Sequence, residues 1–126
     1  MRKWSSKLFK LFRRKHLADD LREEADAHLQ MNGKRYRVLI ANMGTVVMPL
    51  VGNTKYPQIT GDFARSFQAQ KKLSPDIWVA AHAAQYGMQE KFKAGSFVDP
   101  EGYKQAVDRY EKMFRERLAK EQRETR

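Results

Sequence analysis

Apolar residues recur at helical spacing along the first thirty residues of the chain. They are Trp4, Leu8, Leu11, Phe12, Leu17, Leu21 and Ala25, and His28 continues the same spacing. This spacing predicts a helix over residues 2–31. Asn32 and Gly33 follow, a pair that breaks regular structure and favours a turn. The pattern therefore divides the chain into a helical leader, residues 1–31, and a domain over residues 34–126.

After this turn the pattern changes to short apolar runs. Three of them predict strands, over Tyr36–Ile40, Thr45–Met48 and Asp76–Ala81. The second run is followed by Pro49 and a largely polar segment with two more turn signals, Gly52-Asn53 and Pro57, which predict a loop. We expect the three runs to form one short mixed sheet.

Two helical patterns complete the domain. The first covers residues 60–73, places Phe63 and Phe67 one turn apart and stops at Ser74-Pro75. The second covers residues 101–122, where Asp99 is suited to cap the helix and Pro100 to its first position. Its apolar stripe consists of Tyr103, Val107, Tyr110, Phe114 and Leu118. The predicted fold class is α/β, with both helices on one face of the sheet.

Composition limits the size and setting of this fold. The 126 residues suffice for one small domain, and 32% charged residues against 41% hydrophobic ones leave a thin core. The chain has no cysteine, which excludes disulfides and thiolate metal sites. No stretch approaches the ~20 apolar residues of a membrane-spanning helix.

The net charge of +10 is unevenly distributed. Residues 1–15 contain seven Lys or Arg and no acid, whereas residues 16–31 contain five acids and one Arg. The remaining positive charge is diffuse. Because the only dense basic block is the N-terminus, we expect no nucleic-acid groove and no nucleic-acid partner.

The basic N-terminus is a candidate membrane-binding segment. It lacks the uninterrupted apolar stretch of a signal peptide, but apolar residues on one side of a basic helix suit the surface of an anionic membrane. The candidate residues are Arg2, Lys3, Trp4, Lys7, Lys10, Phe12, Arg13, Arg14 and Lys15. A solvated or core-packing helix end explains the same pattern and stays open.

His82 is the candidate metal ligand, because it follows an apolar strand where a loop begins. A lone histidine is more often structural, and the chain offers only two others, His16 and His28. Asp19, Glu23 and Asp26 follow His16 on the leader helix, a pattern that permits a metal site of histidine and carboxylates there. A solvated acidic face with helical ion pairs is the favoured interpretation of that segment.

Residues 34–122 resemble the C-terminal part of metallo-β-lactamases of the third subclass. The motifs that carry the resemblance are the loop Leu50–Pro57, the helix motif Asp62–Phe67, Pro75-Asp76 leading to Ala81-His82-Ala83, and Phe97–Pro100. The resemblance implies half of a four-layer αββα sandwich. It places His82 at the last ligand position of the second zinc site. It also places Asn42, Thr45, Gln85 and Tyr86 at the rim where substrate binds.

The chain departs from that family in the remaining zinc ligands. The family's His-x-His-x-Asp-His run, which supplies most of them, is absent. Zinc is the family's cofactor and supplies a metal-bound hydroxide at neutral pH. We therefore expect no tightly bound zinc, no catalytic residue and no activity from this chain alone. A complementary hydrolase half or a second copy is the expected partner.

The leader resembles a different family. Residues 17–31 follow a pattern similar to the cytoplasmic start of certain bacterial ABC-transporter permeases, Leu-x-x-Asp-Leu-x-x-Glu-x-x-x-His-Leu-x-Met. This resemblance implies a bacterial chain at the inner-membrane surface or in the cytoplasm, although intact hydrolases of the first family are usually exported. The alternative function is thus a membrane-surface or permease-associated interaction module acting through residues 1–31.

Overall fold

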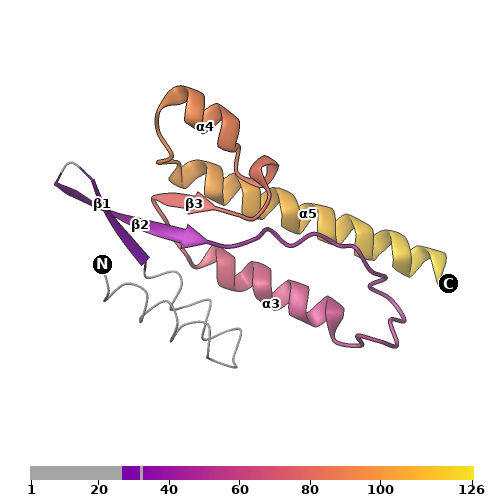
Figure 1. Cartoon of the computed structure of the whole chain (residues 1–126). Coiled ribbons are helices and arrows are strands. Elements are labelled where there is room, and N and C mark those ends of the chain that lie inside the picture. The colour runs from indigo at the N-terminus through magenta and orange to yellow at the C-terminus, as the bar shows by residue number, and fades with distance from the viewer. Residues whose placement is uncertain (1–26, 32) are drawn as a thin grey trace.

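The computed structural model describes residues 27–31 and 33–126 (Figure 1). Its elements are β1 (Ala27–Met31), β2 (Lys34–Ile40), α3 (Ile59–Lys71), β3 (Ile77–Val79), the 3-10 turn η1 (Ala83–Gln85), α4 (Met88–Ala94) and α5 (Pro100–Glu124). The predicted α/β class is confirmed: a small sheet is combined with two long helices. The rest of the leader, residues 1–26, lies outside the described residues.

The sheet has three strands in the order β1-β2-β3. β1 and β2 form an antiparallel hairpin in which Ala27 is opposite Val38 and Met31 is opposite Lys34. Gly33 takes a φ of +76° in the connecting turn, a conformation that glycine adopts without steric cost. β2 and β3 are parallel, with Leu39 opposite Trp78.

Two predicted elements were wrong, the end of the leader helix and the second strand. Ala27–Met31 continues the helical spacing of the leader but is a strand, because pairing with β2 satisfies its backbone groups. His28 accordingly lies on β1 and not on a helix. Thr45–Met48 is not a strand but part of the long loop between β2 and α3, residues 41–58, where Val46 packs against the core and Val47 is 84% exposed.

The two predicted long helices are confirmed, and they run antiparallel beside each other (Figure 1). Asp99 caps α5 as expected: its Oδ1 accepts a hydrogen bond from the Gly102 backbone N–H at 3.0 Å. The phenyl ring of Phe63 stacks on that of Phe114 with centroids 5.5 Å apart, and the ring of Phe67 is tilted against Phe114 at 5.7 Å. These rings form the centre of the contact between α3 and α5.

One face of the sheet is buried against both helices. Leu39 and Trp78, which are paired across β2 and β3, belong to the same apolar cluster as Phe67 and Tyr103. On the opposite face the exposure is uneven: Ile77 is buried, whereas Ile40 is 58% exposed at the end of β2. The predicted arrangement of both helices on one face is therefore observed.

Candidate functional site

The loops that follow β2 and β3 leave the sheet at the same edge, because the two strands are parallel. Their pairing continues beyond the strands, since the Ala41 backbone N–H donates to the Val79 carbonyl at 3.0 Å. β3 itself is shorter than the predicted Asp76–Ala81, covering Ile77–Val79. Residues 41–45 and 80–86 thus face each other, and they include every rim position expected from the sequence.

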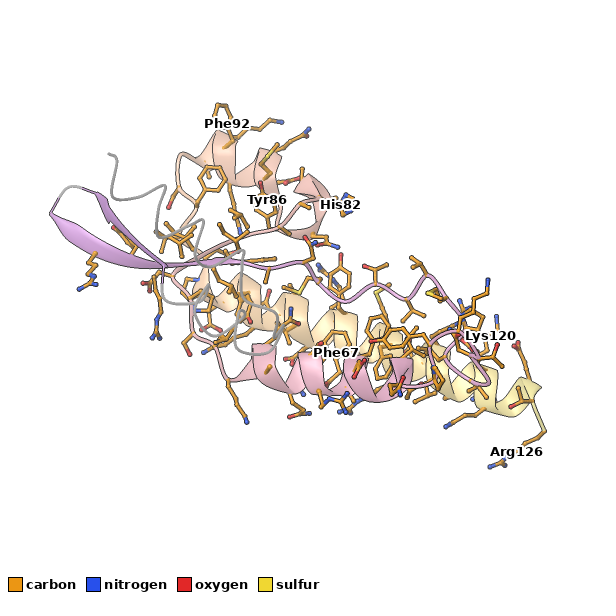
Figure 2. The ribbon with its side chains drawn as sticks, turned by 60° about the horizontal axis from the view of Figure 1, so that its bottom comes forward. Phe67, His82, Tyr86, Phe92, Lys120 and Arg126 are labelled. Atoms are coloured by element: carbon orange, nitrogen blue, oxygen red, sulfur yellow. The ribbon has the colours of Figure 1, made fainter. Side chains whose placement is uncertain are left out.

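His82 lies in the loop after β3, immediately before η1. Its side chain is exposed and points away from the ribbon (Figure 2). Its backbone is held, because the His82 carbonyl accepts a hydrogen bond from the Gln85 N–H at 3.0 Å. The imidazole is therefore presented to solvent from a well-defined turn.

Two of the expected rim residues connect the two loops. The Asn42 Oδ1 accepts a hydrogen bond from the Ala81 backbone N–H at 2.8 Å. In the reverse direction, the Gln85 Oε1 accepts one from the Met43 N–H at 3.1 Å, and Gln85 is buried. The structure thus brings both side chains beside the His82 turn, where they bond to backbone.

The other two rim residues lie on either side of this connection. Thr45 is exposed, and its hydroxyl donates to the Met43 carbonyl at 3.4 Å. Tyr86 is half-buried and meets the ring of Trp78 edge to face, with centroids 6.1 Å apart. A role of these four residues in substrate binding stays a prediction.

Nothing in the sequence indicated that the ammonium group of Lys91 is buried beside Tyr86 and Trp78. Lys91 Nζ lies 4.4 Å from the centroid of the Trp78 ring and 5.6 Å from that of Tyr86. It also forms an ion pair with Asp99 Oδ2 at 3.1 Å. A cation between two aromatic rings and a carboxylate joins α4 to β3 and to the start of α5.

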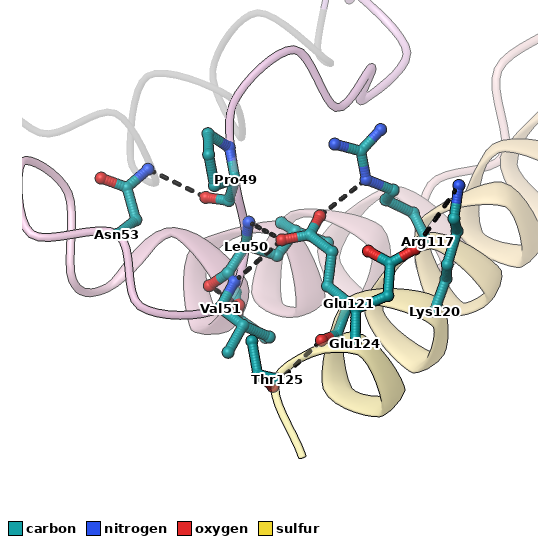
Figure 3. Close-up of polar contacts among 10 residues, drawn as sticks. Pro49, Leu50, Val51, Asn53, Arg117, Lys120, Glu121, Glu124 and Thr125 are labelled. Carbon is teal, nitrogen blue, oxygen red and sulfur yellow. Dashed lines mark hydrogen bonds and ion pairs between the residues drawn. The ribbon is translucent and has the colours of Figure 1, made fainter.

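A second contact that the sequence did not indicate holds the long loop between β2 and α3. Glu121 on α5 bonds there to the backbone of the loop (Figure 3). Its Oε1 accepts hydrogen bonds from the N–H groups of Leu50 at 2.8 Å and Val51 at 3.2 Å, and Arg117 donates to Oε2 at 2.6 Å. Burial opposes ionisation, but the bonds from Arg117, Val51 and Leu50 hold the pKa of the Glu121 carboxyl below its usual value.

The metal ligands available in the described part of the chain do not fit a zinc centre. Catalytic zinc sites use about three protein ligands, and among residues 27–31 and 33–126 no three His, Cys, Asp or Glu side chains form a group that could hold a metal. His82 is thus a single candidate ligand. His16 and the candidate membrane-binding residues of 1–15 lie outside the described residues.

The helices of the described residues include none that is long and apolar enough to cross a membrane. This finding applies to residues 27–31 and 33–126 only.

Comparison with known proteins identifies the fold. No family model and no curated protein matches the sequence. Among solved structures, the chain is similar to a metallo-β-lactamase from Elizabethkingia meningoseptica, with 38% identity, a TM-score of 0.66, and coverage of 74% of this chain and 37% of that one. The chain is also similar to a class B3 di-zinc metallo-β-lactamase from an Alaskan soil metagenome. That match has 39% identity and a TM-score of 0.65, and it covers 72% of this chain and 38% of that one.

A metallo-β-lactamase from Legionella gormanii has 27% identity and a TM-score of 0.68, with 75% of this chain and 39% of that chain covered. The chain therefore spans well under half the length of these relatives. The match agrees with the family expected from the motifs around His82 and Asp99. By shared fold and sequence identity, the chain belongs to the metallo-β-lactamase superfamily and carries part of its domain.

Proposed function

We propose that this chain carries the C-terminal part of a zinc-dependent β-lactam hydrolase domain and does not hydrolyse β-lactams by itself. The observation that carries the proposal is His82. It is presented from the edge where β2 and β3 end, in a chain similar to a di-zinc enzyme. Among the described residues, no group of three or more His, Cys, Asp or Glu side chains could hold a metal ion.

The number of protein ligands that zinc requires supports the proposal that the chain is inactive by itself. The whole sequence contains three histidines and no cysteine, so a pair of zinc ions would need ligands from elsewhere. We propose that the remaining ligands come from a complementary hydrolase part, and that His82 supplies one ligand to the assembled site. No reaction step is assigned to this chain alone.

Exposed apolar surface at the end of β2 supports a partner of that kind. Ile40 is 58% exposed at the end of β2, while its neighbour Leu39, on the opposite face, is 1% exposed. Apolar exposure beside the loop edge fits a surface that a complementary part or a second copy covers. Ile40→Lys is expected to weaken such an association, measured by sedimentation, without changing the midpoint of thermal unfolding.

The proposal is tested with purified chain, zinc and a chromogenic cephalosporin. We expect no turnover above background and no stoichiometric pair of tightly bound zinc ions by metal analysis. Two zinc ions per chain, or turnover that a chelator and His82→Ala both abolish, would contradict it. The positive arm adds the separately produced N-terminal part of a class B3 relative, where any restored turnover must disappear with His82→Ala.

A second candidate function is binding to anionic membrane surfaces through residues 1–15. The supporting observation is in the sequence, where seven cations occur with no acid and with Trp4 and Phe12 among them. Each such cation near an anionic surface contributes about 1 kcal/mol. Binding to anionic vesicles should fall with added salt and with Trp4→Asp and Phe12→Asp. Equal binding to neutral vesicles would contradict it, and with it a location at the inner-membrane surface.

A further inference from the structure

Two amide side chains connect the His82 loop, residues 80–86, to the loop after β2, residues 41–45, and we propose that they are positioning residues for the His82 imidazole. Asn42 accepts from Ala81, the residue before His82, and Gln85 accepts from Met43 in the opposite loop. The two bonds run in opposite directions between the same pair of loops. We call Asn42 and Gln85 the amide clamp.

The clamp is anchored to the helical layer. The Asn42 carbonyl accepts a hydrogen bond from Gln70 Nε2 of α3 at 3.1 Å. The Gln70 carbonyl in turn accepts from the Tyr103 hydroxyl of α5 at 2.6 Å, and both Gln70 and Tyr103 are buried. A continuous series of hydrogen bonds therefore links α5 and α3 to the backbone beside His82.

The sequence separation of its partners distinguishes the clamp from an ordinary loop contact. Each acceptor bonds to a backbone N–H of the other loop, about forty positions away in the chain, so it fixes one loop relative to the other. The His82 carbonyl also bonds to the Gln85 N–H, which makes Gln85 part of the turn that it holds. A ligand or contact residue must be held within about 0.5 Å of its working position to be effective.

This inference changes the role expected for Asn42 and Gln85. Their side-chain oxygens are engaged with backbone N–H groups, and we infer that they act through His82 and not by touching a substrate. The value of that position for zinc or β-lactam chemistry rests on the proposed function. The clamp itself is tested without either.

The test uses substitutions that keep or remove the acceptor oxygen. Asn42→Leu and Gln85→Met preserve approximate size without the acceptor, whereas Asn42→Asp and Gln85→Glu retain it. The readouts in the full chain are the hydrogen-exchange rates of the Ala81 and Met43 amides, the NMR signals of the His82 imidazole, and the midpoint of thermal unfolding. Asn53→Leu is the matched control, because Asn53 bonds within its own loop, to Pro49 and Tyr56.

We expect Asn42→Leu to accelerate exchange of the Ala81 amide roughly tenfold, as loss of one hydrogen bond allows. Gln85→Met should do the same for Met43, and both should shift the His82 imidazole signals. Asn42→Asp keeps the acceptor oxygen and should therefore retain the wild-type exchange rates and imidazole signals. Asn53→Leu should also leave these rates and signals unchanged.

The inference is overturned if the imidazole signals and both exchange rates stay at wild-type values in Asn42→Leu and Gln85→Met. Global unfolding of both variants would also overturn it, by assigning the two residues to general stability. If only Asn42→Leu unfolds, the Met43 exchange rate and the His82 imidazole signals in Gln85→Met decide the test. Because no readout needs zinc or turnover, a chain that proves active alone would refute the proposed function and leave this test intact.

Discussion

The contact between α3 and α5 and the loops around His82 are held together by different forces. The helices meet through the packed rings of Phe63, Phe67 and Phe114, and Phe67 and Phe114 are buried from water. The loops meet through single hydrogen bonds such as those of Asn42 and Gln85. The stability of the fold and the position of the candidate site are therefore separable properties, and substitutions can change one without the other.

The largest effect is expected in the helical layer. Phe67 is fully buried, and Phe67→Ala should lower the free energy of unfolding by about 3–5 kcal/mol, the usual cost of removing a buried phenyl ring. Phe92→Ala is the control, because Phe92 on α4 is 77% exposed and should change stability by less than ~0.5 kcal/mol. Urea unfolding followed by circular dichroism measures both, and equal effects would contradict the assignment of the core.

The next effect is expected where the long loop touches the helices. A Cβ on Gly44 would lie 2.9 Å from Phe67 Cζ and 3.2 Å from the Phe63 ring, so Gly44→Ala should cost about 1–3 kcal/mol through overpacking. Gly61→Ala, in the first turn of α3, would bring its Cβ no closer than 3.4 Å to the Arg65 side chain and should be neutral or stabilising. Thermal unfolding of the pair should therefore give shifts of different size, and a neutral Gly44→Ala would contradict the close approach.

A smaller effect is expected where the two regions connect, at Tyr103. Tyr103→Phe removes the bond to the Gln70 carbonyl and should cost about 1 kcal/mol. Burial raises the pKa of the Tyr103 phenol above its usual 10.0, so its contribution is complete below pH 10 and is lost as the pH rises through the folded pKa. Stability measured between pH 9 and 11 should fall less steeply in the variant, and identical slopes would contradict the burial of the phenol.

The smallest effect is expected at Glu121, at the far end of the loop. Its pKa is held below the usual 4.5, so the carboxylate stabilises the fold above that pH and this contribution is lost as the pH falls through the folded pKa. Glu121→Gln should flatten the dependence of the unfolding midpoint on pH below about 4.5. Glu124→Gln is the control, since Glu124 is 3.9 Å from Lys120 and largely exposed. A variant that keeps the wild-type acid slope would show that the contact contributes nothing.

Much of the fold could be predicted from local patterns. α3, β2 and α5 lie within a few residues of their expected bounds, and the Asp99-Pro100 start of α5 is as expected. These elements are specified by caps, breakers and apolar spacing, which act between residues close together in the chain. The ring contacts of Phe67 also follow from that spacing, because an inward helical stripe must meet another apolar surface.

The candidate site could be predicted only in part, because it depends on pairing between distant segments. His82 was identified from its place after an apolar strand, and Asn42 and Gln85 from the resemblance, but nothing local indicates that their side chains bond across two loops. Residues 27–31 likewise carry a helical pattern yet form β1, since β2 offers backbone partners. The sequence by itself determined the two long helices, the Asp99 cap of α5 and the scarcity of metal ligands. The tertiary structure alone decided which loops meet at His82, because hydrogen bonds between segments some forty residues apart exist only after the chain has folded.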